Sequence, residues 1–267
     1  MRRDLGWRML AAAVLAPTLW MAGCSGGGEG SSKSAVEGQA TGVSNTEIAP
    51  IDPATAATVT GRMIFEGAPP ERRELPMKGN PECSALHATG TTLSEDVIVS
   101  EGGLENVFVY VKSGLEGRAF AVPAKPAVID NKNCLYQPHV IGVQVGQSVE
   151  LLNSDPTLHN VRLKSNNQRN WNIGLPFQGM KQTKKFEAVE VMATLKCDVH
   201  PWMTGYVGVL NHPYFAVTGT GGAYSISGLP PGDYEIEAWH ETYGTRTASV
   251  SVGPSETRSL DLTFAAS

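Results

Sequence analysis

Four side chains near the middle of the chain are of the types that bind a soft transition metal, and they are His159, Cys197, His200 and Met203. Three of them recur at every third position of residues 197–203, where Pro201 favours a tight loop. Such a loop brings a thiolate, an imidazole and a thioether toward one ion, and a second imidazole completes a set that suits copper. Soft sulfur favours Cu(I) and imidazole serves Cu(II), so an ion held by both changes oxidation state with little rearrangement. The predicted chemistry is the transfer of single electrons at one copper ion.

Other interpretations of these residues are weaker on chemical grounds. Cys197 could be a buried free thiol, His200 a surface residue and Met203 core filling, but their shared spacing then has no reason. A binuclear copper centre needs two cysteines in the loop, and residues 197–203 contain one. Structural zinc is usually bound by more cysteine and by no methionine. A mononuclear copper site is the interpretation we adopt.

The elements that position these ligands are predicted to be β-strands. From residue 58 onward apolar residues alternate with polar ones, and turns that contain Gly or Pro separate the runs. The period of two places His159 and Leu163 on one face of a strand, and Leu195 and Cys197 on one face of another. If the two strands pair, both ligands point into the same interior. The sequence therefore predicts an all-β protein with a sandwich architecture.

Residues 119–211 resemble the cupredoxin family, in particular its amicyanin and plastocyanin members. The order Cys-x2-His-x2-Met at 197–203, with Pro and an aromatic residue between the His and the Met, is the short amicyanin loop. The run from Val143 to Val149, followed by His159-Asn160-Val161, matches the family's order of strands. The resemblance implies a Greek-key β-sandwich with one type 1 copper ion. By the same resemblance the equatorial ligands are His159, Cys197 and His200, and the axial ligand is Met203.

The resemblance also assigns roles to residues beside the ligands, which are Asn160, Pro201 and Trp202. Asn160 looks like the asparagine whose hydrogen bonds tie the ligand loops together. The electron is expected to pass through an exposed edge of His200, with the apolar surround of Trp202 meeting a redox partner protein. A four-coordinate site has no open position for a substrate, so we expect no enzymatic activity. Trp202 replaces the family's Phe and Leu195-Lys196 replaces an aromatic pair, which leaves the redox potential and the partner surface open.

Residues 212–267 resemble the carboxypeptidase-regulatory or transthyretin-like β-sandwich family. The shared pattern runs from Thr218 through Tyr224 and Ile226 to Gly228-Leu229-Pro230-Pro231-Gly232. The family's opening strands look like residues 60–63 and 107–111, so residues 58–118 are assigned to the same sandwich and the copper domain to an insertion in it. Residues 264–267 read Phe-Ala-Ala-Ser, where hydroxyisourate-hydrolysing relatives carry Tyr-Arg-Gly-Ser. We therefore expect this module to be a scaffold or docking surface rather than a hydrolase.

Two further cysteines, Cys83 and Cys134, are expected to form a disulfide, because two otherwise unpaired cysteines usually join in an oxidising compartment. The bridge would tie the segment around Asn80 to the entry of the copper domain. Separate free thiols, or a second metal site with His87 or His139, remain open alternatives. Three histidines lack a matching set of ligands and are expected to be structural or exposed, and they are His139, His212 and His240.

Residues 1–23 are expected to be a signal peptide, because a basic start precedes a short apolar stretch. Residues 21–24 resemble the lipobox of bacterial lipoproteins, in which Cys24 is lipidated. An ordinary secretory signal is the alternative. Residues 24–57 are rich in Gly, Ser, Ala and Thr and predict a flexible tether. Together these segments predict an exported protein of the periplasm or cell envelope, anchored by its N-terminal lipid to the outer membrane.

The charge of the chain limits its partners. A formal net charge of −5 argues against a nucleic-acid binder, which needs a concentrated basic surface. Basic residues do gather in the copper domain, at Arg162, Lys164, Arg169, Lys181, Lys184 and Lys185. They are either a solvated face or a surface that steers an acidic redox partner.

Two further functions remain open, namely copper sequestration or delivery without redox turnover, and a structural envelope module in which the metal only stabilises the fold.

Overall fold

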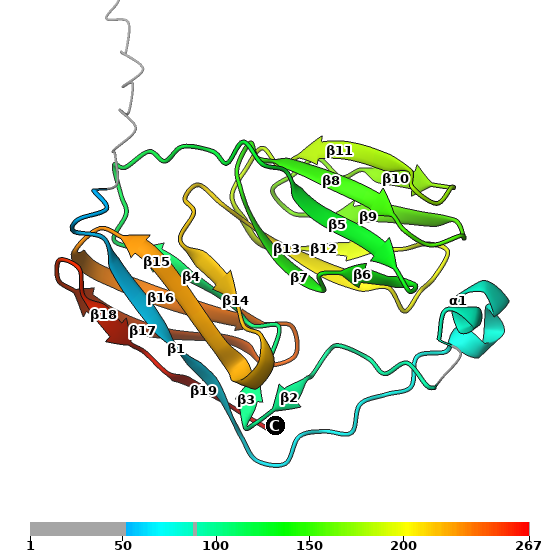
Figure 1. The fold of residues 1–267 in the computed structure, drawn as a ribbon, viewed down its shortest axis with the longest axis horizontal. Helices are drawn as coiled ribbons and strands as arrows, with labels where there is room; N and C mark the ends of the chain where they lie inside the picture. The colour runs from blue at the N-terminus through cyan, green and yellow to red at the C-terminus, as the bar shows by residue number, and fades with distance from the viewer. Residues whose placement is uncertain (1–51, 88–89, 267) are drawn as a thin grey trace, which may run out of the picture. The chain divides into compact units, whose positions relative to one another are not determined.

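The computed structural model describes residues 52–87 and 90–266, and almost all of its regular structure is β-strand (Figure 1). The predicted signal peptide, Cys24 and most of the predicted tether lie outside these residues. Among the described residues no helix combines the length and the apolar character needed to cross a membrane. The prediction of an all-β sandwich fold is confirmed, and the strands form two sandwiches, each with its own hydrophobic core.

The first sandwich, here called the central sandwich, is built from two sheets. The five-stranded sheet has the order β10 (Asn172–Leu175), β9 (His159–Lys164), β12 (Glu190–Lys196), β13 (Thr204–Leu210) and β7 (Val140–Gln144). The four-stranded sheet has the order β11 (Lys181–Lys185), β8 (Ser148–Asn153), β5 (Ala127–Lys132) and β6 (Leu135–Gln137), and Figure 1 shows it as one layer. These sheets hold every strand that neighbours the candidate ligands.

The core of the central sandwich follows from the alternation seen in the sequence. Along β9 the side chains of Val161 and Leu163 are buried while Arg162 and Lys164 are not. Along β12 the buried residues Ala193 and Leu195 lead to Cys197, one residue beyond the strand. Because β-strands turn successive side chains to opposite faces, His159 and Cys197 both continue the apolar faces of their strands.

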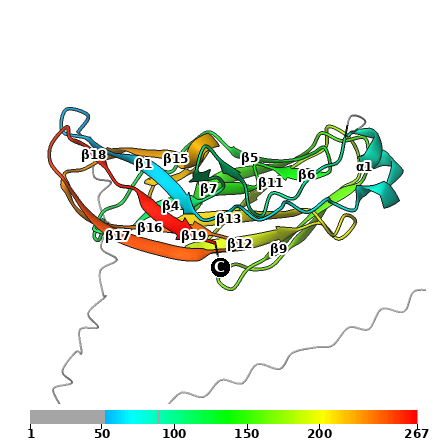
Figure 2. The ribbon, with the colours of Figure 1, turned by 90° about the horizontal axis from the view of Figure 1, so that it is seen from below.

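The second sandwich, here called the flanking sandwich, encloses a separate core. One of its sheets has the order β15 (Ala223–Leu229), β1 (Ala57–Glu66), β3 (Gly103–Leu104) and β2 (Val99–Ser100). Strands β18 (Thr257–Ser259) and β19 (Leu262–Ala265) pair in parallel with β1, and Figure 2 shows the three side by side. The other sheet has the order β14 (Phe215–Val217), β4 (Phe108–Ser113), β16 (Gly232–His240) and β17 (Gly244–Val252).

Three short helical turns complete the described elements: η1 (Met77–Gly79), α1 (Pro81–Ala85) and η2 (Thr220–Gly222). Asn80 begins α1, because its side-chain oxygen accepts a hydrogen bond from the backbone N–H of Cys83 at 3.1 Å, and Pro81 follows at the first helical position. We assigned all of residues 58–118 to the flanking sandwich, and the structure differs here. Met77 and Cys83 are buried in the core of the central sandwich.

A small apolar cluster joins strands of both sandwiches. Phe108 of β4 is fully buried and packs with Val140 and Leu210, which belong to β7 and β13. Two glycines of the central sandwich face the Phe108 ring. A Cβ atom at Gly208 would lie 2.5 Å from this ring, and one at Gly142 would lie 2.7 Å from it. The two glycines thus give the aromatic ring room to approach the sheet of the central sandwich.

Candidate metal centre

The candidate ligands come from two neighbouring antiparallel strands and the loop that follows one of them. Strands β9 and β12 pair with Leu195 opposite Leu163, so His159 and Cys197 both lie near the same end of the sheet. The loop 197–203 then closes on itself, since Met203 N donates to the carbonyl of His200 at 2.9 Å and Cys197 N donates to the carbonyl of Met203 at 3.4 Å. The predicted tight loop is present.

The loop brings three of the four predicted ligands to one point. Nδ1 of His200 lies 3.0 Å from Nδ1 of His159 and 3.8 Å from Sγ of Cys197. One donor atom from each of the three residues lies within 4.8 Å of the others. Both rings are fully buried and Cys197 is 3% exposed. Met203 is fully buried in the same core cluster as Cys197.

The donor set fits a single metal ion. Nitrogen ligands bind at about 2 Å and thiolate sulfur at about 2.3 Å, so two donors of one small ion are roughly 3–4 Å apart. The measured separations of 3.0 and 3.8 Å are of this size. The types of donor, two imidazoles and a thiolate beside a thioether-bearing core residue, are those that copper accepts in either of its oxidation states.

Asp155, which the sequence analysis did not single out, holds one ligand ring. Nε2 of His159 lies 2.9 Å from the buried carboxylate of Asp155, which also accepts from the backbone N–H groups of Asn133 and Cys134. Burial opposes ionisation of Asp155, but these hydrogen bonds outweigh it and lower its pKa below the ordinary value. An ionised carboxylate can only accept, so Nε2 of His159 carries a proton and Nδ1 is free to face the other donors.

The thiol of Cys197 is prepared for ionisation. Burial raises its pKa, but hydrogen bonds with the side chains of His159 and His200 outweigh burial and lower the pKa to about 6. A thiolate is the form in which cysteine binds metals. The site therefore favours the charge state that a metal ligand requires.

Asn160 links the two ligand-bearing segments, as the family resemblance implied. Its Oδ1 lies 3.3 Å from Sγ of Cys197 and accepts from the backbone N–H of Asp198 at 2.7 Å. Its Nδ2 donates to the side chains of Asn172 and Asp198. Because these contacts span β9, β10 and the loop, they fix the position of Cys197 relative to His159.

The expectation of an exposed His200 edge is wrong. His200 is fully buried, and its Nε2 lies 3.0 Å from Nδ2 of Asn80. Trp202 is half-buried, with its ring 5.2 Å from that of His200 and its Nε1 donating to the carbonyl of Cys134 at 3.1 Å. Pro201 is exposed. Asn80 was missed as a neighbour of the site because it precedes His200 by 120 residues.

The predicted disulfide between Cys83 and Cys134 is confirmed, with a Cα–Cα distance of 5.7 Å. Both cysteines are therefore unavailable as thiolate ligands, which removes the alternatives of free thiols and of a second metal site at these positions. His87 instead contacts the carbonyl of Asn133 at 2.8 Å. Among the described residues Cys197 has the only free thiol.

The remaining histidines that we expected to be structural are all buried. His139 contacts the carboxylates of Glu241 and, at 3.9 Å, Glu95. Nδ1 of His212 accepts from Tyr214 N at 3.2 Å, and Nδ1 of His240 accepts from Thr242 N at 3.2 Å. None of the three belongs to the groups of described residues that could hold a metal ion.

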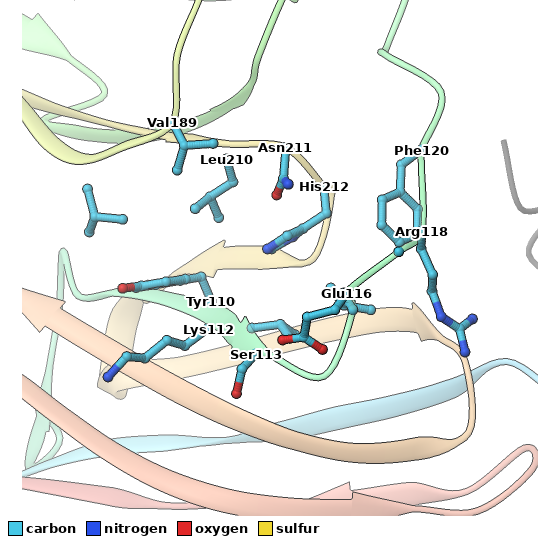
Figure 3. A pocket seen from close by; sticks show the side chains of 14 residues that line it. Tyr110, Lys112, Ser113, Glu116, Arg118, Phe120, Val189, Leu210, Asn211 and His212 are labelled. Carbon is cyan, nitrogen blue, oxygen red and sulfur yellow. The ribbon is translucent and has the colours of Figure 1, made fainter. Parts of the chain in front are cut away.

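A pocket of about 320 Å³ lies apart from the candidate ligands, none of which lines it. Figure 3 shows Tyr110 and Lys112 of β4 on one side of it, with Leu210 of β13 and His212 opposite them. Glu116 and Arg118 add charges of both signs to its lining. The mixed lining indicates no single class of ligand.

Comparison with known proteins finds a family model that matches the C-terminal part of the sequence. Residues 207–265 match the family model of the carboxypeptidase regulatory-like domain. No curated protein matches the sequence. The match to the family model begins in β13, so it includes the last strand of the central sandwich as well as most of the flanking sandwich.

Solved structures that resemble the chain include several copper proteins. A purple cupredoxin from Nitrosopumilus maritimus is 26% identical, with 31% of this chain and 98% of that chain covered and a TM-score of 0.27. A Cu(I) form of an amicyanin variant is 22% identical, covering 38% of this chain and 97% of that one with a TM-score of 0.29. A copper-containing nitrite reductase from Thermus scotoductus is 21% identical, covering 39% of this chain but only 25% of its own, with a TM-score of 0.31. Because these TM-scores are low, the solved structures carry no argument about the centre, and the match to a family model is confined to residues 207–265.

Proposed function

We propose that this protein is an electron carrier in which His159, Cys197 and His200 would hold one copper ion, with Met203 as a fourth ligand. The observation that carries the proposal is the convergence of three buried donor atoms of types suited to copper within 4.8 Å of one another. A bound copper ion would supply the one-electron couple. The protein's part is to hold the donors in one arrangement for both oxidation states.

Electron transfer is the function that the surroundings of the site favour over catalysis. The donors lie in a closed core, where Asp155 fixes one ring and Asn160 fixes the thiolate loop. Rigid ligands reduce the rearrangement that accompanies a change of oxidation state. Catalytic metal sites keep a position open for water or substrate. Full burial of both rings gives a substrate no such approach, and we infer that the protein is not an enzyme.

The partner we propose is another redox protein. Exposed apolar side chains lie next to the ligands in sequence at Leu158 and Val199, and Phe177, two residues beyond β10, is 72% exposed. A basic edge lies on β11, whose residues Lys181–Lys185 are mostly exposed. Together these surfaces suit a partner with an apolar contact patch and acidic residues around it. We further infer that the protein acts in the cell envelope, on the basis of residues 1–24.

Spectroscopy and voltammetry of the copper-loaded protein test the proposal. A thiolate–copper bond is expected to give intense absorption at about 600 nm, and a carrier gives reversible one-electron voltammetry. Cys197→Ser should abolish the absorption, whereas Thr194→Ser on the preceding strand β12 should preserve it. Absence of the band from the wild-type protein at one equivalent of Cu(II) would overturn the proposal.

Burial of His200 favours one alternative, a protein that stores or delivers copper. A fully buried ligand edge slows the exchange of electrons with a partner as well as the loss of the ion. Slow, irreversible voltammetry together with transfer of Cu(I) to a chelator or acceptor protein would identify this function. A protein that binds no copper at all would instead be a structural module.

A further inference from the structure

A short segment from much earlier in the chain covers the His200 side of the metal centre. This cap segment consists of residues 77–86 and contains η1 and α1. Met77 and Cys83 of the cap segment are buried, and Leu86 packs partly against the same core as Cys197. The cap segment is therefore part of the wall of the site, although Cys83 precedes Cys197 by 114 positions.

Asn80 is the residue of the cap segment that reaches the candidate ligands. Its Oδ1 accepts from Cys83 N at 3.1 Å, which holds the carboxamide at the start of α1. Its Nδ2 lies 3.0 Å from Nε2 of His200, on the side of the ring away from Cys197. The side chain of Asn80, rather than solvent, thus lies against Nε2 of His200, whose ring is fully buried.

The disulfide holds the cap segment in this position. Cys83 is bonded to Cys134, and both sulfur atoms lie within 4.8 Å of a ring nitrogen of His200. Cys134 is itself fixed, since its N–H donates to Asp155 at 2.8 Å and its carbonyl accepts from Trp202 at 3.1 Å. Cys134 therefore joins the cap segment, the loop 197–203 and the carboxylate of Asp155, which orients His159.

We propose that Asn80, held over His200 by the Cys83–Cys134 disulfide, is a positioning residue of the metal centre, and that the cap segment is the barrier that a metal ion crosses on its way in or out. The proposal rests on the proposed copper site. Groups that hold the outer edge of a metal-bound histidine fix the orientation of its ring. Oδ1 of Asn80 is taken by Cys83 N, so Nδ2 is the carboxamide atom that covers Nε2 of His200.

Two substitutions at one position separate this role from a purely structural one. Serine also begins helices well but is too short to reach His200, so Asn80→Ser keeps the start of α1 and removes the contact. Aspartate keeps the helix start and the length of the side chain over His200, so Asn80→Asp is the conservative variant. Circular dichroism and chemical unfolding of all three proteins check that the fold is preserved.

The first readout is pulsed electron paramagnetic resonance of the Cu(II)-loaded full chain in D₂O. This method detects the outer nitrogen of a bound imidazole and any deuterons near it. In Asn80→Ser we expect a shifted outer-nitrogen signal for one histidine and a stronger coupling to deuterons, from the D₂O that replaces the carboxamide. Asn80→Asp should keep the wild-type coupling.

The second readout is the rate at which a chelator removes copper. We expect removal from Asn80→Ser to be roughly tenfold faster than from the wild type, the low end of the effect of losing an outer partner of a metal-bound histidine. Asn80→Asp should restore the slow rate. Identical nitrogen signals and identical release rates in wild type and Asn80→Ser would overturn this inference while leaving the copper site intact. A wild-type protein that binds no copper would overturn both proposals together.

Discussion

Nε2 of His159 lies 2.9 Å from Oδ2 of Asp155, four residues earlier in the chain. The carboxylate fixes both the orientation of the ring and the nitrogen that carries its proton. Asp155→Asn preserves the size of the side chain but weakens this interaction. We expect the affinity for Cu(II) to fall by about 10- to 100-fold, as for other outer partners of metal ligands.

Competition titrations against a chelator of known affinity measure this effect. Asp233→Asn provides the matched control, because Asp233 is exposed on β16 of the flanking sandwich. An unchanged affinity in Asp155→Asn would show that the carboxylate does not act on the metal centre.

The disulfide is expected to contribute strongly to stability. It links residues 51 positions apart, and closing a loop of that length in the unfolded chain corresponds to about 4 kcal/mol. The double variant Cys83→Ala/Cys134→Ala should therefore lose a large part of this amount in chemical unfolding. The wild-type protein kept under reducing conditions should unfold at the same denaturant concentration as the double variant. Equal stability of the oxidised wild type and the double variant would refute the prediction.

The buried rings of His212 and His240 predict a loss of stability in acid. Burial lowers the pKa of each to about 4, below the value of about 6.5 for a free histidine. The folded state therefore favours the neutral rings, and their contribution is complete above about pH 6.5 and is lost as the pH falls toward 4. By about pH 4.5 we expect each ring to cost on the order of 2 kcal/mol of unfolding free energy.

Unfolding titrations at several pH values measure this loss. His240→Gln removes one of the two titrating groups, so its stability should change less steeply between these pH values than that of the wild type. A slope that stays the same would show that His240 does not titrate in this range.

The close contact between Phe108 and Gly208 predicts that a larger side chain at position 208 lowers the stability of the fold. A Cβ atom at Gly208 would lie 2.5 Å from the Phe108 ring and 3.0 Å from Cε of Met192. Gly208→Ala should cost about 1–3 kcal/mol, as for overpacking elsewhere. Gly174→Ala on β10 meets no atom within 4 Å and is the control, with stability expected to remain at the wild-type level or above. Thermal unfolding of the two variants decides between these outcomes.

The membrane attachment is tested at Cys24, which lies outside the described residues. Cys24→Ser removes the only thiol of the lipobox-like stretch. We expect the protein to move from the membrane fraction to the soluble fraction on cell fractionation, because the lipid is its proposed anchor. Wild-type protein found mainly in the soluble fraction would favour the ordinary secretory signal.

The convergence of His159, Cys197 and His200 could be predicted from the sequence because chemistry and spacing coincide there. Cys197 and His200 are three residues apart, and strand alternation brings His159 to the same end of the sheet. The covering of His200 by Asn80 was not accessible, because no local pattern relates residues 120 positions apart. The role of Asp155 was hidden for another reason. An aspartate before a proline reads as an ordinary turn residue, and only the fold turns its carboxylate toward His159.

The pairing of β1 imposes an order on folding. Thr60 of this strand donates to the carbonyl of Tyr224, 164 residues later, and Phe65 lies opposite Phe264. The central sandwich has all its strands once the chain has reached Leu210, whereas β1, apart from its short pairing with β3, has to await partners made after that point. Until then its backbone groups are an open edge that can pair with the wrong chain. A nascent molecule thus has all strands of its central sandwich first, and a truncation within the last strands would leave that sandwich intact beside an aggregation-prone edge.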